Sequence, residues 1–480
     1  MDEILTRPAI ELADLIRRRD LRAVDLVAAA ITRIEAVNPT LNAMVQDRFD
    51  AARREAAAAD RRAARGGALP PLLGVPCTIK EAFALEGMPN SAGLVSRRGV
   101  RATTDAVAVR RLRDAGAIPL GVTNVSELCM WMESDNRVYG LTRNPYDPTR
   151  TVGGSSGGEA ALLGAGAAPF GLGSDVGGSI RMPAFFCGVF GHKPTGGLVP
   201  NGGQFPNASN EASRYLTTGP MCRRAADLAP LLRILAGPPH EVPRSLPWRL
   251  GDPDRVSAKG LRVFVVPDNG WLPVAPSLRA AQQRAADALA ARGATVEERP
   301  IEGLRDSLPI WSSMLRLAGG PSFKSLMGGG PPVPAGRELL RWALGRSPHT
   351  LPAIGLGLLE SLEGLAPGRS AHWMRRGLAL RRELSDLLGV DGLLLYPPYT
   401  TPAPRHHTPM LLPFQWVYTA IFNVLELPVT QVPLGLDRRG LPLGVQVVAS
   451  HGRDHLSIAA ARWLEEDLGG WTPPPGFPSS

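Results

Sequence analysis

Apolar residues recur at helical spacing in three segments near the N-terminus. The first spans Thr6 to Arg19 and begins with a capping threonine. The second runs from Leu26 to a stop at Asn38-Pro39, and the third is the alanine-rich stretch from Asp50 to Arg65. Each segment keeps its apolar side chains on one face, which is typical of helices that pack on a core. The pattern predicts an N-terminal helical layer over residues 1–70.

Beyond residue 71 the pattern changes to short apolar strands that alternate with helices. The expected strands are 72–80, 118–123, 261–267, 293–300, 391–398, 428–436 and 441–449, the last two joined as a hairpin by the turn DRRG. The expected helices are 104–115, 228–235, 278–292 and 456–468. This alternation predicts an α/β protein with βαβ units and a largely parallel sheet, in which functional groups stand where strands end.

Two stretches break the alternation. Residues 310–367 are rich in Gly, Pro, Leu, Met and Trp. They predict irregular helical structure, either a lid or pocket wall within 305–370 or an ordinary peripheral insertion. Residues 237–253 are proline-rich and predict a surface excursion.

Charge and cysteine content exclude several classes of protein. The net charge of +9 comes almost entirely from arginine, and the chain of 480 residues has four lysines. No basic stripe with interleaved aromatics is present, so we expect no nucleic-acid partner. The four cysteines form no CxxC pair, and His406-His407 lack companion ligands, so we expect free thiols, no metal and no cofactor. No signal peptide and no apolar run of about 18 residues occurs, which predicts a cytoplasmic protein without a transmembrane segment.

Candidate chemistry lies in the stretch 151–191, where the loops GGSSGG and DVGGS bracket the apolar segment AALLGAGAAPFGLG. Glycines allow close backbone approach, and serines in such loops have backbone N–H groups beside an exposed hydroxyl. That arrangement suits nucleophilic attack on a carbonyl, because the N–H groups hold the oxyanion. A flexible Gly/Ser linker would not enclose so apolar a segment. The chain therefore has a candidate serine-enzyme core within residues 71–235.

Lys80 ends the apolar run LLGVPCTIK in a chain that otherwise uses arginine. Lysine becomes a base when burial or neighbours lower its pKa, whereas arginine is not deprotonated in proteins. A strand-end lysine that extends its stem to solvent is the alternative interpretation. Lys80 and the two loop serines Ser155 and Ser179 are separated by 75 and 24 residues.

These motifs and intervals resemble the amidase signature family. The stretch GGSSGGEAALLGAGAAPFGLGSDVGGSIRMPAFFCGVFGHKPT matches the whole serine/glycine-rich core, and the likeness extends from about Leu12 to the C-terminal helix. Within the family, GVTNVSELCMWMESDNRVYG, RNPYD, VPNGGQFP and LTTGPMCRRAADLAPLL resemble the fatty acid amide hydrolases, the second vertebrate type in particular. The resemblance implies one domain over 1–480. Its fold would be a large twisted mixed β-sheet with helices on both faces and a helical or irregular insertion.

The resemblance also implies roles for particular residues. Ser179 would be the nucleophile, Ser155 a bridging serine beside a cis peptide, and neutral Lys80 the base. The oxyanion hole would be made by the backbone N–H groups of Val176, Gly177, Gly178 and Ser179. Polar bracing of the two loops would come from Ser156, Asp175 and Arg181, of which the last two are alternatively a structural ion pair. His192 has no part in such a relay and is interpreted as a satisfied core or surface histidine.

We expect the substrate to be a neutral hydrophobic amide, because aromatic and methionine side chains adjoin the core. The candidate pocket residues are Met130, Trp131, Met132, Trp311 and Met314. AFFCGVF (184–190) is interpreted as core rather than pocket. A carbamate or an ester presents the same carbonyl to the same nucleophile, so urethanase and esterase activities are also expected.

Two other functions stay open. One is the glutaminase subunit of an aminoacyl-tRNA amidotransferase, which shares the triad. Met182 and the run GGLVPNGGQFP (196–206) stand where that subunit has Gln and a GRVSR-like run, which weakens this interpretation. The other is an inactive binding protein, which the intact triad disfavours. A homodimer is one candidate assembly.

Overall fold

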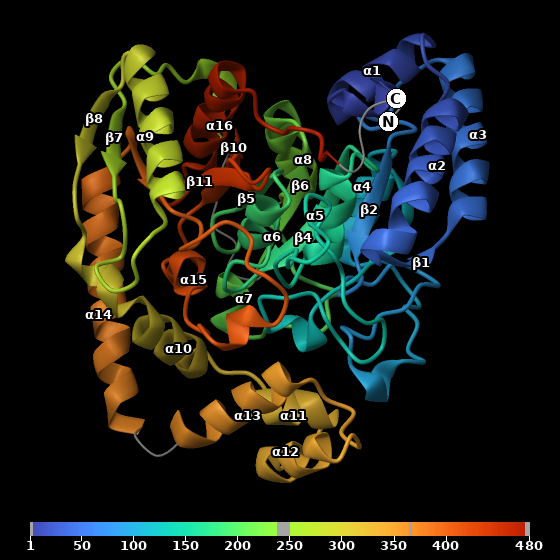
Figure 1. Cartoon of the computed structure of the whole chain (residues 1–480). Helices are drawn as coiled ribbons and strands as arrows, with labels where there is room; N and C mark the ends of the chain where they lie inside the picture. The colour runs from blue at the N-terminus through green and yellow to red at the C-terminus, as the bar shows by residue number, and fades with distance from the viewer. Residues whose placement is uncertain (1–2, 238–249, 364–366, 476–480) are drawn as a thin grey trace.

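The computed structural model describes residues 3–237, 250–363 and 367–475. Most of the expected proline-rich excursion lies outside these ranges. The chain forms one sheet in the order β1-β3-β2-β4-β6-β5-β10-β11-β9-β7-β8, with helices on both faces (Figure 1). The strands are β1 (Met44–Asp47), β2 (Pro76–Lys80), β3 (Ile118–Thr123), β4 (Phe170–Asp175), β5 (Phe190–Lys193), β6 (Thr217–Cys222), β7 (Arg262–Val265), β8 (Thr295–Glu298), β9 (Gly392–Tyr396), β10 (Val429–Leu436) and β11 (Pro442–Ala449).

The sheet is mixed, and the prediction of a largely parallel sheet is wrong. Among the described residues, six of the ten strand pairings are antiparallel and four are parallel. Strand–helix alternation produced the parallel pairs of β2 with β3 and β4 and of β7 with β8 and β9. The centre differs because β6, β5 and the predicted hairpin β10–β11 follow one another in antiparallel order. The mixed sheet agrees with the fold that the family resemblance implied.

The helices fill the layers around this sheet. They are α1 (Ala9–Arg18), α2 (Ala23–Leu41), α3 (Phe49–Arg65), α4 (Val107–Asp114), α5 (Gly157–Gly164), α6 (Arg181–Phe186), α7 (Ala212–Tyr215), α8 (Leu228–Leu235), α9 (Pro276–Ala291), α10 (Ser307–Leu317), α11 (Phe323–Gly328), α12 (Ala335–Ala343), α13 (Leu351–Glu363), α14 (Pro367–Leu388), α15 (Val417–Val424) and α16 (Asp454–Leu468). A short 3-10 helix, η3 (Glu127–Cys129), follows β3 in the chain. Among the described residues, no helix combines the length and apolarity that a membrane crossing requires.

The predicted stop at Asn38-Pro39 and the predicted cap at Thr6 both differ from the structure. The second helix does not stop at Asn38-Pro39 but continues to Leu41. Pro39 removes only one N–H donor, in the final turn, and the Asn38 side chain accepts from the N–H groups of Ala43 and Met44. Thr6 is not the cap of the first helix, because the carboxylate of Asp227 accepts from the first N–H groups of α1 instead.

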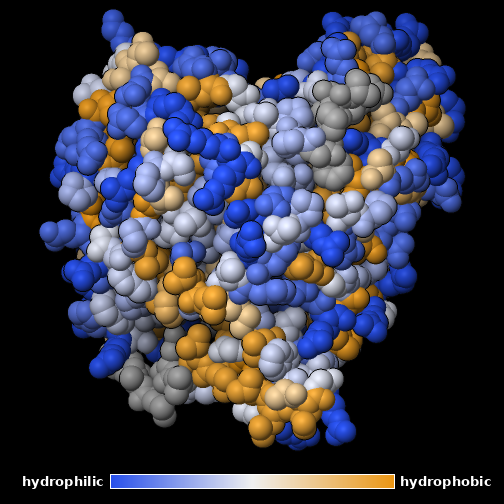
Figure 2. All heavy atoms as spheres, viewed as in Figure 1, coloured by the Kyte–Doolittle hydropathy of each residue, from blue (hydrophilic) through white to orange (hydrophobic). Residues whose placement is uncertain are grey.

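The stretch predicted to be irregular is made of regular helices, α10 to α13, followed by the long α14. Gly329 ends α11 with a φ of 68°, whereas Gly336 of α12 and Gly355 and Gly357 of α13 lie inside their helices. This helical insertion (307–363) contributes Met327, Ala353 and Ile354 to a small second hydrophobic cluster, which also contains Leu94 and, from η3, Leu128. Hydrophobic side chains also gather on its surface at the bottom of Figure 2, where Figure 1 places α11 to α13.

Candidate active site

Lys80 stands at the end of β2, a strand whose five residues are all buried. Its Nζ lies 2.7 Å from Ser155 Oγ, 3.0 Å from Ser174 Oγ and 3.4 Å from the Ser174 carbonyl. The lysine therefore does not extend to solvent, as the alternative interpretation required. Ser174 is a polar partner that the sequence analysis missed, although it lies only five residues before Ser179.

Burial lowers the pKa of Lys80, while Cys129, Asp175 and Glu159 act in the opposite direction. The net direction favours a neutral amine, which has a lone pair and two N–H donors. With Ser174 accepting from the N–H groups, the lone pair is left to face the Ser155 hydroxyl. The geometry can therefore move a proton from Ser155 to Lys80.

Ser155 is held by a tight backbone loop. The Gly154–Ser155 peptide is cis, as the family resemblance implies. A Cβ on Gly154 would lie 2.3 Å from the Trp131 carbonyl, and one on Gly157 would lie 2.3 Å from Ser134 Oγ. Only glycine, which has no Cβ, fits beside the Trp131 carbonyl and Ser134 Oγ, which explains the spacing of the GGSSGG motif.

The loop that carries Ser179 touches the Ser155 loop directly. The Ser156 N–H donates to the Ser179 carbonyl over 3.1 Å. Lys80 and Ser155 are wholly buried, whereas Ser179 is 8% exposed. Within 151–193, all residues are buried apart from Val176 and Gly177. Val176 and Gly177, at the start of the DVGGS loop, are therefore the part of this stretch most exposed to solvent.

Asp175 and Arg181 form a buried ion pair that spans this loop. The Asp175 carboxylate accepts from Gly178 N–H (2.7 Å) and Ile180 N–H (3.1 Å) and from Arg181 Nε (3.0 Å) and Nη2 (2.9 Å). Burial acts to raise the pKa of Asp175, but the charge and hydrogen bonds of Arg181 hold that pKa well below its usual range. The pair is thus both a structural ion pair and a brace for the backbone around Ser179.

The same brace changes the expected set of oxyanion donors. The Gly178 N–H is engaged by Asp175 and is not free. In the part of the chain that the structure describes, the N–H groups of Val176, Gly177 and Ser179 donate to no other residue. Three of the four predicted donors are therefore available to a ligand.

Aromatic side chains stand at the exposed start of the loop. Trp311 of α10 donates from Nε1 to the Val176 carbonyl over 2.8 Å, and its ring meets Trp416 edge-on with centroids 4.7 Å apart. Thr419 of α15 donates to the Gly177 carbonyl over 2.8 Å. The sequence analysis predicted Trp311 but missed Trp416 and Thr419, for which no local motif gives a signal.

The other predicted pocket residues are placed differently. Met314 packs against Gly377 of α14, and Met132 accepts from the Tyr399 hydroxyl inside the core. The carbonyl of Trp131 lies over Gly154, and Met130 is half-buried at the end of η3. The AFFCGVF segment is fully buried, as expected of core.

Other candidate groups lie outside this constellation. His192 is buried between Thr430 Oγ1 (2.9 Å) and Asp454 Oδ1 (3.1 Å), a satisfied core histidine. No cluster of three His, Cys, Asp or Glu residues suited to a metal occurs in the described ranges. The thiol of Cys129 hydrogen-bonds Ser155, and burial raises the pKa of this thiol.

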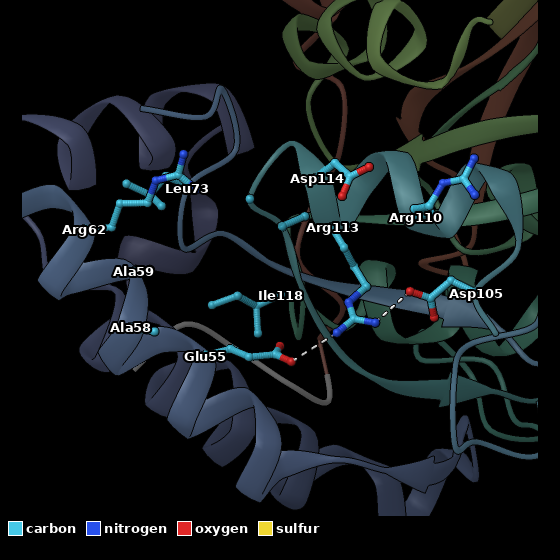
Figure 3. Close-up of a pocket in the computed structure, with 12 residues that line it drawn as sticks. Glu55, Ala58, Ala59, Arg62, Leu73, Asp105, Arg110, Arg113, Asp114 and Ile118 are labelled. Atoms are coloured by element: carbon cyan, nitrogen blue, oxygen red, sulfur yellow. Dashed lines mark hydrogen bonds and ion pairs between the residues drawn. The ribbon is translucent and has the colours of Figure 1, made fainter. Parts of the chain in front are cut away.

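A separate hollow of about 420 Å³ lies between α3 and α4 (Figure 3). Arg113 crosses its floor with Nη1 2.6 Å from Asp105 and Nη2 3.6 Å from Glu55. These paired charges neutralise one another, and the predicted site residues do not line the hollow. It has no part in the site around Ser179.

Comparison with known proteins identifies the family of this chain. The family model described as Amidase matches residues 25–457. Fatty-acid amide hydrolase 2-A of Danio rerio is 50% identical over 98% of this chain and 90% of its own length. A glutamyl-tRNA(Gln) amidotransferase subunit of Moorella thermoacetica is 32% identical over 97% of each chain. The solved structure of 6-aminohexanoate cyclic dimer hydrolase complexed with substrate superposes with a TM-score of 0.81 at 27% identity over the whole of both chains. The chain therefore belongs to the amidase signature family of amide-hydrolysing enzymes.

Proposed function

We propose that this enzyme hydrolyses neutral hydrophobic amides through Ser179, Ser155 and Lys80, and that it also cleaves esters and carbamates. The observation that carries the proposal is the 2.7 Å contact between Lys80 Nζ and Ser155 Oγ in a buried setting that disfavours the ammonium form. A buried neutral lysine beside a hydroxyl is an arrangement for proton transfer rather than for stability alone.

In the proposed reaction, Ser179 Oγ attacks the substrate carbonyl while its proton passes to Ser155 and the Ser155 proton passes to Lys80. The free N–H groups of Val176, Gly177 and Ser179 stabilise the oxyanion. The proton then returns from Lys80 through Ser155 to the leaving nitrogen, and the C–N bond breaks to leave an acyl-enzyme. Water adds to the acyl carbonyl by the same relay, which releases the acid and restores Ser179.

The substrate preference rests on what surrounds the exposed start of the nucleophile loop. Trp311 and Trp416 offer a wide apolar surface beside Val176 and Gly177. We therefore assign α10, with the insertion that follows it, as a wall of the substrate site. The name of the zebrafish relative, a fatty-acid amide hydrolase, supports a hydrophobic acyl group. An ester or a carbamate differs only in the atoms next to the carbonyl, so the same nucleophile and donors would act on it.

The experiment that tests this proposal is a comparison of kcat/KM across fatty acyl amides, acyl anilides, esters, aryl carbamates and glutamine. We expect the hydrophobic amides to exceed glutamine by a large factor. A higher kcat/KM for glutamine or another small charged amide would contradict the hydrophobic site.

The second candidate is a glutaminase subunit of an aminoacyl-tRNA amidotransferase, favoured by the 32% identity to the Moorella protein. Met182 is buried directly after Arg181, at the place where that subunit has glutamine. Glutaminase assays with and without amidotransferase partner subunits separate the two functions. Glutaminase activity that requires the partners would support this second candidate.

A further inference from the structure

Glu159 is a wholly buried carboxyl group that the proposed relay does not use. It lies in the first turn of α5, four residues after Ser155. Its oxygens accept from two threonine hydroxyls, Thr78 Oγ1 and, over 3.1 Å, Thr123 Oγ1. A Cβ on Gly171 would lie 2.1 Å from Glu159 Oε2, so the carboxyl is pressed against β4 at a glycine.

Strand register places this carboxyl beside Lys80. Thr78 is two residues before Lys80 on β2, so the two side chains share one face of the strand. Thr123 is the cross-strand neighbour of Lys80 on β3, and Gly171 is the neighbour of Thr78 on β4. Glu159 thus bridges the two residues that flank Lys80.

Few titratable groups face Glu159 and Lys80. Lys80 and the Cys77 thiol, both on β2, interact with Glu159. Lys80 is faced by Asp175 from β4, by Cys129 from η3 and by Glu159 from α5. Asp175 is already neutralised by Arg181. Burial raises the pKa of Glu159 to about 8, against the two threonine hydrogen bonds and the charge of Lys80.

We propose that Glu159 is a positioning residue that sets the pH at which Lys80 gives up its proton. A carboxylate at this place stabilises the lysine ammonium, and a neutral acid does not. Proton loss from Glu159 therefore holds the proton on Lys80, and a neutral side chain at 159 releases it at lower pH. The inference rests on the proposed role of Lys80 as the base.

The chain offers a readout that does not need turnover, because it has four lysines: Lys80, Lys193, Lys259 and Lys324. Side-chain NMR of lysine-labelled protein follows each amine through a pH titration, with Lys80 assigned from Lys80→Arg. In Glu159→Gln we expect the Lys80 midpoint to fall by about one pH unit or more, the size of effect given by an adjacent opposite charge. Lys193 is the internal control. Burial and Arg181 lower its pKa to about 7 without a contribution from Glu159, so its midpoint does not move.

A second variant covers the case in which Glu159→Gln does not fold. Thr123→Val removes one hydrogen bond from the carboxylate and leaves Lys80 in place, so the Lys80 midpoint falls by a smaller amount in the same direction. An unchanged or raised Lys80 midpoint in whichever folded variant is measured overturns the inference. A lowered midpoint in an enzyme that cleaves no amide, ester or carbamate leaves the inference standing and rejects the proposed function. Hydrolysis by the wild-type enzyme together with an unchanged Lys80 midpoint in the variants supports the proposed function and overturns the inference.

Discussion

The serine core (151–193) and the helical insertion (307–363) are built in opposite ways. In the core, every residue except Val176 and Gly177 is buried, and the charges of Asp175 and Arg181 are fully paired. The insertion leaves Leu340 of α12 and Leu344, directly after that helix, about 70% exposed and rests on a small hydrophobic cluster. We expect the core to resist change because its side chains are buried and its ion pair, Asp175 with Arg181, is buried on both sides. The insertion tolerates change on its outer face, so we expect substrate preference to vary there while the chemistry stays constant.

The insertion contacts the catalytic region through Trp311, His349 and Thr350. Trp311 reaches the nucleophile loop through the Val176 carbonyl. Glu127 of η3 accepts from the Thr350 N–H (2.7 Å), and its Oε1 lies 2.6 Å from His349 Nδ1. The insertion therefore touches the catalytic region through these polar contacts and through apolar packing of Met327, Ala353 and Ile354 on Leu128.

The largest expected effect comes from the nucleophile of the core. Ser179→Ala removes the attacking oxygen, so kcat falls by about 10⁶-fold and labelling by a fluorophosphonate serine probe disappears. Ser257→Ala, an exposed serine far from the site in sequence, is the matched control and keeps both. Probe labelling that persists in Ser179→Ala would mean that another serine is the nucleophile.

Removal of the base comes next. Lys80→Ala lowers kcat/KM by about 10²- to 10⁴-fold, the usual contribution of general base catalysis. Because burial lowers the pKa of Lys80, the neutral amine forms as pH rises, and wild-type kcat/KM rises with it. Lys80→Arg stays protonated and is as inactive as alanine, whereas Lys259→Ala is neutral in effect. Loss of activity in EDTA with recovery in zinc would contradict this mechanism.

Removal of the buried ion pair between Asp175 and Arg181 is expected to lower the stability of the fold. Arg181→Met leaves a buried carboxylate on Asp175 without its partner, which lowers the free energy of unfolding by about 3–5 kcal/mol. The lowered pKa of Asp175 means that wild-type stability from this group is present above the usual carboxyl pKa and is lost as pH falls toward the folded value. Urea unfolding of both proteins across acidic pH measures this. An Arg181→Met protein as stable as wild type would show that the pair is not needed.

Substitution of Trp311, which contacts the nucleophile loop, tests whether the insertion selects the substrate. Trp311→Ala is expected to lower kcat/KM for acyl anilides by about tenfold while leaving small amides less affected. Trp311→Phe keeps an aromatic ring and loses only the hydrogen bond to Val176, so it separates apolar contact from loop support. Equal losses for large and small amides in Trp311→Ala would assign the residue to the loop alone.

The smallest effect is expected on the outer face of the insertion. Leu344→Gln changes an exposed side chain, so the free energy of unfolding moves by no more than about 0.5 kcal/mol. Ile354→Ala, in the buried cluster of the same insertion, is the matched comparison and costs about 2–5 kcal/mol. A large destabilisation by Leu344→Gln would show that this face is covered in solution.

How much the sequence could predict follows from where the information lies along the chain. The serine loops were predictable because close backbone approach requires glycines, which stand in the sequence as local motifs, and Lys80 was predictable because it ends an apolar run in a chain that otherwise uses arginine. Thr419 supports Gly177 from 242 residues away, and Asp227 caps α1 from 218 residues away. Such partners are chosen by the tertiary fold, and no local pattern marks them. Ser174 could have been predicted from the sequence, since it lies on β4, the strand that leads to Ser179.

The irregular appearance of the insertion misled the prediction for a similar reason. Gly and Pro commonly break helices, but here Gly329 and Gly345 lie at helix ends with positive φ, and α13 contains Gly355 and Gly357 in its interior. Composition alone does not distinguish the two cases. The position of each glycine relative to the apolar period does.

The contact of Glu127 with His349 and Thr350 limits which segments of this chain can be exchanged with those of a related protein. Glu127 is 2% exposed and His349 6%, so each would be left without a buried partner if the other came from a different relative. A chimera that exchanges residues 307–363 alone would separate them, and one that also exchanges 126–132 would keep them together. Recombination between family members should therefore preserve these two segments as a unit, even though more than 200 residues lie between them.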